Sequence, residues 1–306
     1  MIQASGVRIG WSDLPATVHD AVAGILGGAV VEARSQAGGF SPGTADRVVT
    51  AGGRRAFVKA VGAPVDPFCL ALHRREAAVA AQLPASAPVP RLLGVHDDGD
   101  WIALVLEDVD GRHPRTPWVA EELDAVVRAL AELGRVAAPG LRPAAEVCGH
   151  DLQGWARWAA DPPADADPWV TAHLPELLAA AERAAAAVEG DALVHADVRA
   201  DNLLIRADGS VVVVDWPHAC RGAAWLDRAM LTVNVLLYGG EPAPVDAPPG
   251  AVTDLLAGYL GFFTEMGRRP DPPTLPTLRA FQRAQAAALR PWVAERLTPR
   301  AGRGGR

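Results

Sequence analysis

The most constraining stretch of this sequence is residues 193–215, which read LVHADVRADNLLIRADGSVVVVD. Two short apolar segments flank the Ala-Asp-Gly triplet at 207–209. Glycine tolerates positive φ, so this triplet is typical of a tight turn. The pattern predicts a β-hairpin whose second strand returns antiparallel to the first and brings Asp215 back beside Asn202.

The same stretch contains the motif His195-x-Asp197-x4-Asn202, with Asp215 at the far end of the hairpin. Phosphoryl transfer from a nucleotide needs one carboxylate at the acceptor hydroxyl, an amide on a metal ion and a second carboxylate on the metals. We therefore take Asp197 as the candidate catalytic residue, and Asn202 and Asp215 as candidate Mg²⁺ ligands. The alternative is a charged surface loop beside a core hairpin. The motif alone is weak, and the hairpin with its terminal Asp makes it more specific.

Composition narrows the class of protein. Half of the 306 residues are hydrophobic and 21% are charged, as in ordinary globular enzymes. The net charge of −7 argues against nucleic acid as a partner. The three cysteines, Cys69, Cys148 and Cys220, have neither a metal-binding nor a disulfide spacing. We expect no signal peptide, no membrane span and a cytoplasmic location.

The pattern of elements predicts an α+β protein with two lobes. Residues 1–107 are expected to form a nucleotide-binding sheet with an inserted helix at 67–83 and a short helix at 13–26. Its predicted strands are at 29–37, 46–50, 55–61, 92–96 and 101–106. Residues 108–298 are expected to be mainly helical, with the hairpin as the only convincing strands and helices at 121–137, 169–188, 223–238, 251–266 and 274–296. The Gly/Arg-rich tail, 299–306, is predicted to be disordered.

Lys59 lies within an apolar strand, where an unpaired ammonium would cost several kcal/mol. Glu76, in the following predicted helix, is the expected partner in a nucleotide site. Lys59 could instead be an exposed lysine on an edge strand, and Glu76 could pair with Arg75 within its helix.

Two further segments have positions that suit nucleotide contacts. A glycine-rich turn between the first two strands can bring backbone N–H groups close to phosphate oxygens, although a plain hairpin turn is nearly as good an interpretation. The last strand of the first lobe ends in two acids, at a joint that would contact the base through its backbone. The candidate residues are Gly38, Gly39, Phe40 and Ser41 in the turn, and Glu107 and Asp108 at the joint.

With these motifs, residues 15 to 295 resemble the aminoglycoside phosphotransferase family of the protein-kinase-like fold. The resemblance implies that Asp197 is catalytic, that Asn202 and Asp215 bind magnesium and that Lys59 contacts the α/β-phosphates. It also implies that Asp227, in Leu226-Asp227, braces the catalytic loop.

The sequence departs from the family at several positions. Ala196 stands where the family often has glycine, and Pro217 makes a switching metal loop less plausible. Arg199 stands where protein kinases carry a lysine near the transferred phosphate. It is a candidate for stabilising charge on the γ-phosphate, or a surface residue.

The short interval between Asp215 and Asp227, with no Ala-Pro-Glu after it, disfavours a protein substrate. We expect transfer of the γ-phosphoryl group of ATP, with GTP left open, to a hydroxyl of a small molecule such as an aminoglycoside-like antibiotic. The alternatives are a kinase of an amino alcohol, a sugar or a homoserine-like metabolite, and a nucleotide-binding pseudokinase. The oligomeric state stays open.

Residues 139–170 and 238–296 are the expected walls of the acceptor pocket. Their acids would suit a polycation, whereas loop acids are usually only solvated. Their tryptophans, with Trp225, could line an apolar pocket or fill the core, and the core is the expected place. The acids are Asp161, Asp165, Asp167, Glu241, Asp246, Asp254, Glu265 and Asp271; the tryptophans are Trp155, Trp158 and Trp292.

Overall fold

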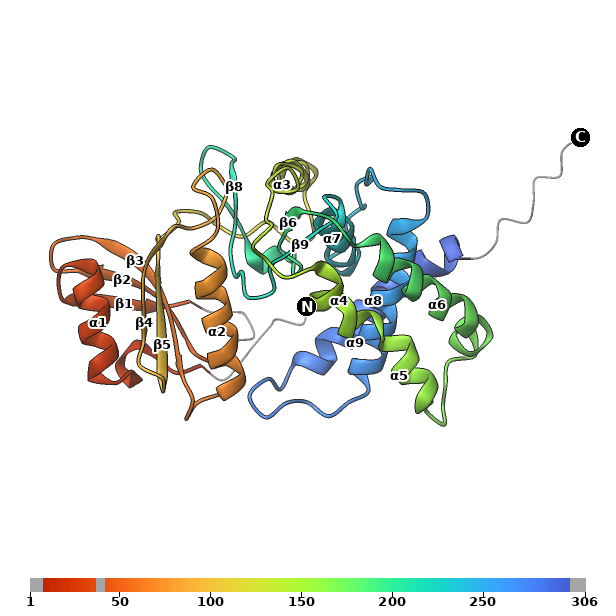
Figure 1. The fold of residues 1–306 in the computed structure, drawn as a ribbon, viewed down its shortest axis with the longest axis horizontal. Coiled ribbons are helices and arrows are strands. Elements are labelled where there is room, and N and C mark those ends of the chain that lie inside the picture. The colour runs from red at the N-terminus through yellow and green to blue at the C-terminus, as the bar shows by residue number, and fades with distance from the viewer. Residues whose placement is uncertain (1–7, 37–41, 298–306) are drawn as a thin grey trace, which may run out of the picture.

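The computed structural model describes residues 8–36 and 42–297. The described part has a β-rich lobe at one end and a helical lobe at the other (Figure 1). Both the turn at 38–41 and the tail at 299–306 lie outside these residues. Within the described ranges, no helix is long and apolar enough to cross a membrane.

The first lobe is built on a five-stranded antiparallel sheet with the order β1-β2-β3-β5-β4. Its strands are β1 (Val30–Ser35), β2 (Thr44–Thr50), β3 (Arg55–Gly62), β4 (Leu92–Asp97) and β5 (Trp101–Leu106). Each predicted strand is confirmed to within a few residues at its ends. Alternate side chains point to opposite faces, so the sheet needs a cover on both sides.

Two helices provide that cover (Figure 1). A 3₁₀ turn (Trp11–Asp13) leads into α1 (Ala16–Leu26), which packs on one face, and α2 (Pro67–Ala80) packs on the other. Asp66 caps α2 by accepting hydrogen bonds from the N–H groups of Phe68 and Cys69 at 2.9 and 3.0 Å. This cap fixes the start of the helix that carries Glu76.

The second lobe is a helical assembly in which α8 packs against α4, α5, α6 and α9. The helices are α3 (Ala120–Leu133), α4 (Ala144–Leu152), α5 (Gly154–Ala160), α6 (Pro168–Ala187), α7 (Leu226–Leu237), α8 (Ala251–Gly267) and α9 (Leu278–Leu297). Trp155, Trp158 and Trp225 lie in its core and Trp292 packs against it, as predicted. The sequence did not mark α4 and α5, because elements this short span too few turns to show a periodic pattern.

The predicted hairpin is confirmed as β7 (Leu203–Ile205) paired with β8 (Val211–Val213). Gly209 has φ +81°, the conformation that the turn requires. The expectation of no other convincing strands in this lobe was wrong, since β6 (Ala192–Val194) pairs with β9 (Cys220–Gly222). Three-residue strands far apart in sequence carry no local signal. This second pair holds both ends of residues 195–219.

Candidate active site

Lys59, Glu76 and Asp215 form an ionic cluster between the two lobes. The ammonium of Lys59 on β3 donates to both carboxylate oxygens of Glu76 on α2 at 2.8 Å, and to the Asp215 carboxylate beyond β8. The side chains of Lys59 and Glu76 are only 13% and 4% exposed. The predicted pair is confirmed, and neither alternative, an exposed lysine or a pairing within the helix, describes these residues.

Lys59 and Asp215 keep their charges at neutral pH. Burial by itself lowers the pKa of Lys59, but Asp215 and Glu76 more than compensate and raise it above its ordinary value. Burial raises the pKa of Asp215, but the effect of Lys59 is larger and opposite, so the net shift of the pKa is downward. Burial also leaves the pKa of Glu76 raised despite Lys59. A cationic Lys59 beside an anionic Asp215 therefore faces the space between the lobes.

The loop that carries Asp197 is held from below by Asp227 at the start of α7. The two carboxylate oxygens of Asp227 accept hydrogen bonds from the N–H groups of His195 and Ala196 at 2.7 and 2.9 Å. Ala196 has φ +63°, a strained conformation for a residue with a side chain. Ala196 occupies the position where glycine was expected, and the contacts with Asp227 hold it there.

Asp197, Asn202 and Asp215 come together as the hairpin predicted. The side-chain N–H group of Asn202 donates to the backbone oxygen and Oδ2 of Asp197 at 2.8 and 3.2 Å. The N–H of Val214 donates to the backbone oxygen of Asn202 at 2.9 Å. Asp215 has φ +71°, and its side chain is 38% exposed.

The donors in this loop fit Mg²⁺. Because the amide nitrogen of Asn202 is committed to Asp197, its oxygen is the atom left for a metal, and Asp215 adds a carboxylate. Over the described residues, no group of three or more His, Cys, Asp or Glu could hold a metal ion. Mg²⁺ commonly uses only one or two carboxylates and takes its other ligands from phosphates and water.

Arg199 is not the surface residue of the alternative interpretation. Its guanidinium contacts Asp201 at 3.0 and 3.1 Å and Asp197 at 3.6 Å, and its side chain is 15% exposed. Burial alone lowers its pKa, but Asp197 and Asp201 raise it above its ordinary value. A permanently cationic side chain therefore sits beside the candidate catalytic carboxylate.

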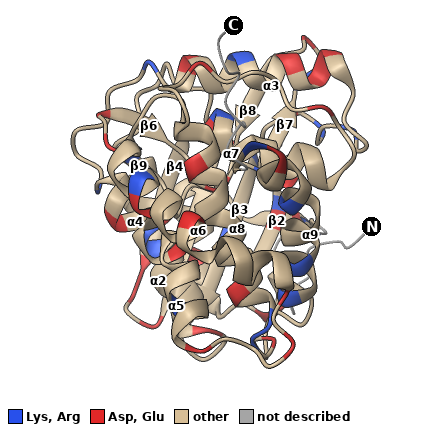
Figure 2. Cartoon of the chain, turned by 90° about the vertical axis from the view of Figure 1, so that its right-hand side faces the viewer, with Lys and Arg blue, Asp and Glu red and all other residues tan. Residues whose placement is uncertain are grey.

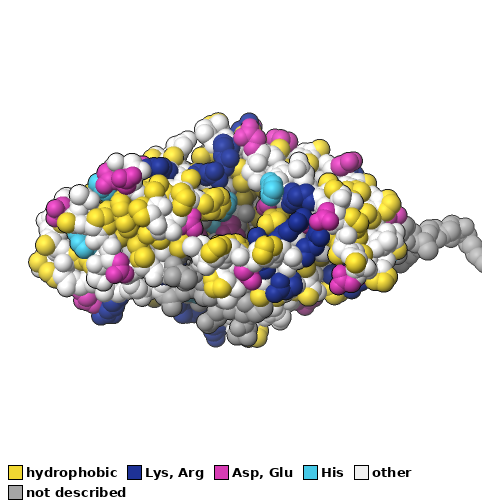
Figure 3. Space-filling model, turned by 90° about the horizontal axis from the view of Figure 1, so that it is seen from below, with side chains coloured by type: hydrophobic (Ala, Val, Ile, Leu, Met, Phe, Trp, Pro, Cys, Tyr) yellow, Lys and Arg dark blue, Asp and Glu magenta, His cyan; other side chains and the backbone are white. Residues whose placement is uncertain are grey.

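The lobe cleft is a cavity of about 330 Å³ lined by β2, β3, α2, the joint after β5 and the hairpin. A hollow is visible between the lobes in the space-filling view (Figure 3). Of the candidate residues, Lys59, Glu76, Glu107, Asp108, Asn202 and Asp215 line the cleft. The candidates Gly38 to Ser41 lie outside the described residues, and only Pro42 and Gly43 of their turn are seen.

Glu107 and Asp108 have their side chains engaged by arginines: Glu107 by Arg91 and Arg206, Asp108 by Arg47 and Arg55. These ion pairs tie the joint to neighbouring strands and the hairpin. They leave the backbone of the joint as the part that could meet a base.

Among the basic residues of the lobe cleft that sequence reasoning missed are Arg8 and His73. His73 lies one helical turn before Glu76, a spacing that could have pointed to it. Its ring nitrogen Nδ1 contacts the Cys69 carbonyl oxygen at 3.0 Å, and burial lowers its pKa to about 4, so it is neutral at pH 7. No local motif marks Arg8.

A second cavity, the helical cavity, lies on the other side of the catalytic loop and measures about 140 Å³. Asp197 and Arg199 line it from the loop, and side chains of α4, α7, α8 and α9 form its other walls. Residues from both predicted wall segments, 139–170 and 238–296, take part.

None of the eight acids expected near the acceptor lines this cavity. Most contact arginines elsewhere: Asp161 and Glu265 contact Arg268, Asp167 contacts Arg290, Asp254 contacts Arg183 and Asp271 contacts the backbone of Arg279. Asp165, Glu241 and Asp246 are exposed. Acidic and basic residues are interspersed over the helical lobe (Figure 2).

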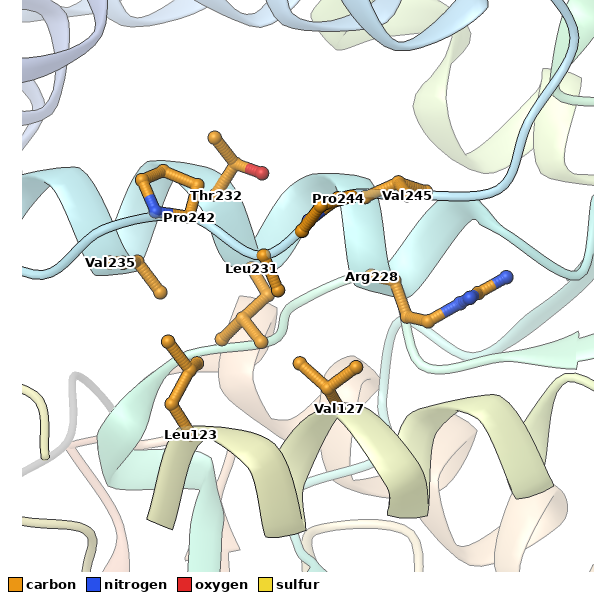
Figure 4. A pocket seen from close by; sticks show the side chains of 10 residues that line it. Leu123, Val127, Arg228, Leu231, Thr232, Val235, Pro242, Pro244 and Val245 are labelled. Carbon is orange, nitrogen blue, oxygen red and sulfur yellow. The ribbon is translucent and has the colours of Figure 1, made fainter. Parts of the chain in front are cut away.

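A further depression between α3 and α7 is closed by the chain at Pro242–Val245 (Figure 4). Its volume is about 10 Å³, room for about one water molecule. It does not compete with the other two cavities as a ligand site.

Residues 37–268 match the phosphotransferase enzyme family. The chain belongs to this family. It is thus a small-molecule phosphotransferase of the protein-kinase-like fold. The match covers most of the chain and includes the ionic cluster of Lys59, Glu76 and Asp215, the catalytic loop at 195–202 and most of the helical cavity. Membership in this family favours a small-molecule kinase over the alternatives of a pseudokinase and a protein kinase.

Three solved structures resemble this phosphotransferase. One is a thermostable mutant of aminoglycoside phosphotransferase APH(4)-Ia in ternary complex with ADP and hygromycin B, with a TM-score of 0.58 and 15% identity, covering 94% of this chain and 100% of that one. The second is macrolide 2'-phosphotransferase MphH from Brachybacterium faecium, with a TM-score of 0.54 and 18% identity, covering 94% of this chain and 98% of that one. The third is amicoumacin kinase hAmiN in complex with AMP-PNP, Ca²⁺ and Ami, with a TM-score of 0.54 and 14% identity, covering 94% of this chain and 96% of that one. At these identities the likeness shows the fold alone. A comparison with curated proteins finds no match.

Proposed function

We propose that this phosphotransferase moves the γ-phosphoryl group of ATP to a hydroxyl of a small molecule. The position of the catalytic loop between two cavities carries the proposal. Asn202 and Asp215 line the lobe cleft, while Asp197, which lies in the same loop as Asn202, lines the helical cavity. A donor in one cavity and an acceptor in the other would meet at this loop. Two of the similar structures hold ADP or AMP-PNP in the same fold.

On the donor side, Lys59 would contact the nucleotide phosphates, because its ammonium is fixed between Glu76 and Asp215 at the cleft wall. Asp215 and Asn202 would hold Mg²⁺, which would supply positive charge against the negative charge that develops during transfer. Glu76 shares the Lys59 ammonium with Asp215. The backbone after β5 would contact the nucleotide base. Because side chains there do not distinguish adenine from guanine, the preference for ATP over GTP is itself part of the proposal.

On the acceptor side, Asp197 would orient the hydroxyl and accept its proton. Its carboxylate is itself positioned by the Asn202 amide at 3.2 Å and the Arg199 guanidinium at 3.6 Å. Because the transition state is loose, positioning and charge neutralisation do most of the work. We assign Arg199 the further role of stabilising charge on the transferred group, held in place by Asp201.

The test is Asp197→Asn, which keeps the shape of the side chain and removes the proton acceptor. We expect kcat to fall by about 10²–10⁴, with Mg-ATP affinity changed less than about threefold. Asp208→Asn in the exposed hairpin turn is the matched control and should keep full activity. Phosphoryl transfer at the parent rate by the Asp197 variant would refute the assignment.

We also propose a reducing, cytoplasmic setting. Cys69, Cys148 and Cys220 are free thiols, and all three are buried. Labelling of the three thiols after denaturation, in protein taken directly from cells, tests this.

A further inference from the structure

We propose that the acceptor is a small alcohol with an apolar, ring-sized face and at most one amino group, and that Asp151 and Gln285 recognise its polar groups. This inference rests on the proposed function and specifies its acceptor. A polycationic aminoglycoside is the acceptor class that it excludes.

The first line of support is the apolar wall of the helical cavity. Tyr259, Phe262 and Phe263 on α8 and Phe281 on α9 all line it. Tyr259, Phe263 and Phe281 are each less than a tenth exposed, so their positions are fixed by the core. A wall of fixed aromatic side chains favours a ligand that presents an apolar ring.

The second line of support is a pair of polar side chains that have no protein partner. Asp151 on α4 and Gln285 on α9 line the cavity. In the described ranges, neither side chain makes a hydrogen bond or an ion pair, although Gln285 is only 8% exposed. The neighbouring amides differ, since the side-chain oxygens of Asn234 and Gln282 accept protein hydrogen bonds at 3.3 and 2.8 Å. Buried polar groups normally form hydrogen bonds within the protein. Since Asp151 and Gln285 form none among the described residues, their side chains are free to bind a ligand.

The third line of support is the charge of the cavity. Its charged lining residues are Asp151, Asp197 and Arg199. Two carboxyls of the lining therefore face one guanidinium, that of Arg199, which lies 3.6 Å from Asp197 and also contacts Asp201 outside the lining, so the lining has a net charge of −1. Burial, helped by Asp197 and opposed by Arg157, raises the pKa of Asp151 to about 7. The cavity can therefore neutralise one ammonium group at most.

A polycation would bring further ammonium groups without counter-charges. Burying such a group unpaired costs several kcal/mol. This cost acts against an acceptor with several amino groups.

Size points the same way. The helical cavity, at about 140 Å³, has less than half the volume of the lobe cleft, at about 330 Å³. It suits an acceptor smaller than the nucleotide.

The experiment compares three acceptors under Mg-ATP: a phenyl-bearing monoamino diol, its uncharged counterpart without the amino group, and an aminoglycoside with several amino groups. Phosphorylated product is identified by mass and rates are taken from ADP release. We expect kcat/KM to be at least about tenfold higher for both phenyl-bearing alcohols than for the aminoglycoside. A higher value for the aminoglycoside would overturn the inference and leave the proposed function intact.

Two variants test the named residues. Asp151→Asn should raise KM about tenfold or more for the monoamino diol, because a charge-assisted contact is lost, and less than about threefold for the uncharged diol. Gln285→Leu should raise KM for both. Asp246→Asn, on the exposed 239–250 loop, is the matched control, and KM for ATP should stay constant in all three. An unchanged KM for the monoamino diol in Asp151→Asn would overturn the role of Asp151.

The remaining outcomes also discriminate. If Mg-ATP binds but neither phenyl-bearing alcohol is phosphorylated, the acceptor class is wrong while the nucleotide half of the proposed function stands. If Mg-ATP does not bind, the proposed function itself fails.

Discussion

Asp227→Asn is the substitution whose effect follows most directly from the geometry of the catalytic loop. Asp227 is 5% exposed, and its two carboxylate oxygens accept the N–H groups of His195 and Ala196 at 2.7 and 2.9 Å. Asparagine has the same shape but only one oxygen. Its NH₂ group must face one of the two backbone N–H groups, so a buried donor would meet another donor.

The magnitude follows from two effects. A hydrogen bond to a charged group contributes about 1.5–3 kcal/mol, and a buried donor left without an acceptor costs about 1–3 kcal/mol. Relaxation of the loop recovers part of this, so we expect the free energy of unfolding to fall by about 3 kcal/mol. The strained conformation of Ala196, at φ +63°, loses one of the contacts that hold it. Asp197 follows directly in the chain, so kcat should fall about a hundredfold.

The assay pairs urea unfolding, followed by tryptophan fluorescence, with steady-state phosphorylation kinetics. KM for ATP should change less than about threefold, because Lys59 and Glu76 keep their contacts in the first lobe. Asp246→Asn serves as the surface control. A loss of less than about 0.5 kcal/mol together with an unchanged kcat would refute the bracing role of Asp227.

Three other perturbations have defined outcomes. Ala196→Gly should raise the free energy of unfolding by about 1 kcal/mol in urea, since glycine adopts positive φ without strain; a loss of stability would contradict the strain argument. Lys59→Met should lower kcat/KM for ATP by about a hundredfold or more, because the phosphates lose their cation while Asp215 and Glu76 remain; near-normal kinetics would remove Lys59 from the site. Asp151 has a folded-state pKa of about 7, above its unfolded value, so its contribution to stability is full at low pH and is lost as pH rises to 7. Asp151→Asn should therefore gain about 2 kcal/mol relative to the parent between pH 5 and 7 in urea unfolding, with a slope of about 1.4 kcal/mol per pH unit that flattens near pH 7, and a constant difference would show that Asp151 does not titrate there.

Much of the nucleotide half of the site was predictable because its signals are local. The hairpin from Leu203 to Val213 is encoded by two apolar segments and Gly209, and this alone brings Asp215 back to Asn202. Lys59 within an apolar strand needed a partner on electrostatic grounds, and Glu76 in the next helix was the near one. Asp227 was expected to brace the loop only by resemblance, and the two hydrogen bonds give that expectation its physical basis.

The wrong or missing predictions concern contacts between distant segments. The β6–β9 pair joins strands of three residues from either side of the catalytic loop, with no turn between them to signal the pairing. Exposed loop acids such as Asp161 looked available for a cation, but arginines far along the chain contact them. Arg8 lines the lobe cleft from the start of the described chain without any motif.

By itself, then, the sequence determined the reaction class. The groups proposed to transfer the phosphoryl group lie on a strand, on the next helix, and on a hairpin with the loop before it, where short-range periodicity and turn chemistry decide the geometry. Only the tertiary structure decided what surrounds Asp197 on its other side. That wall is assembled from α4, α8 and α9, whose side chains meet through packing of the helical core rather than through any pattern within one segment. Burial then determines which acids are paired with arginines and which, like Asp151, remain for a ligand.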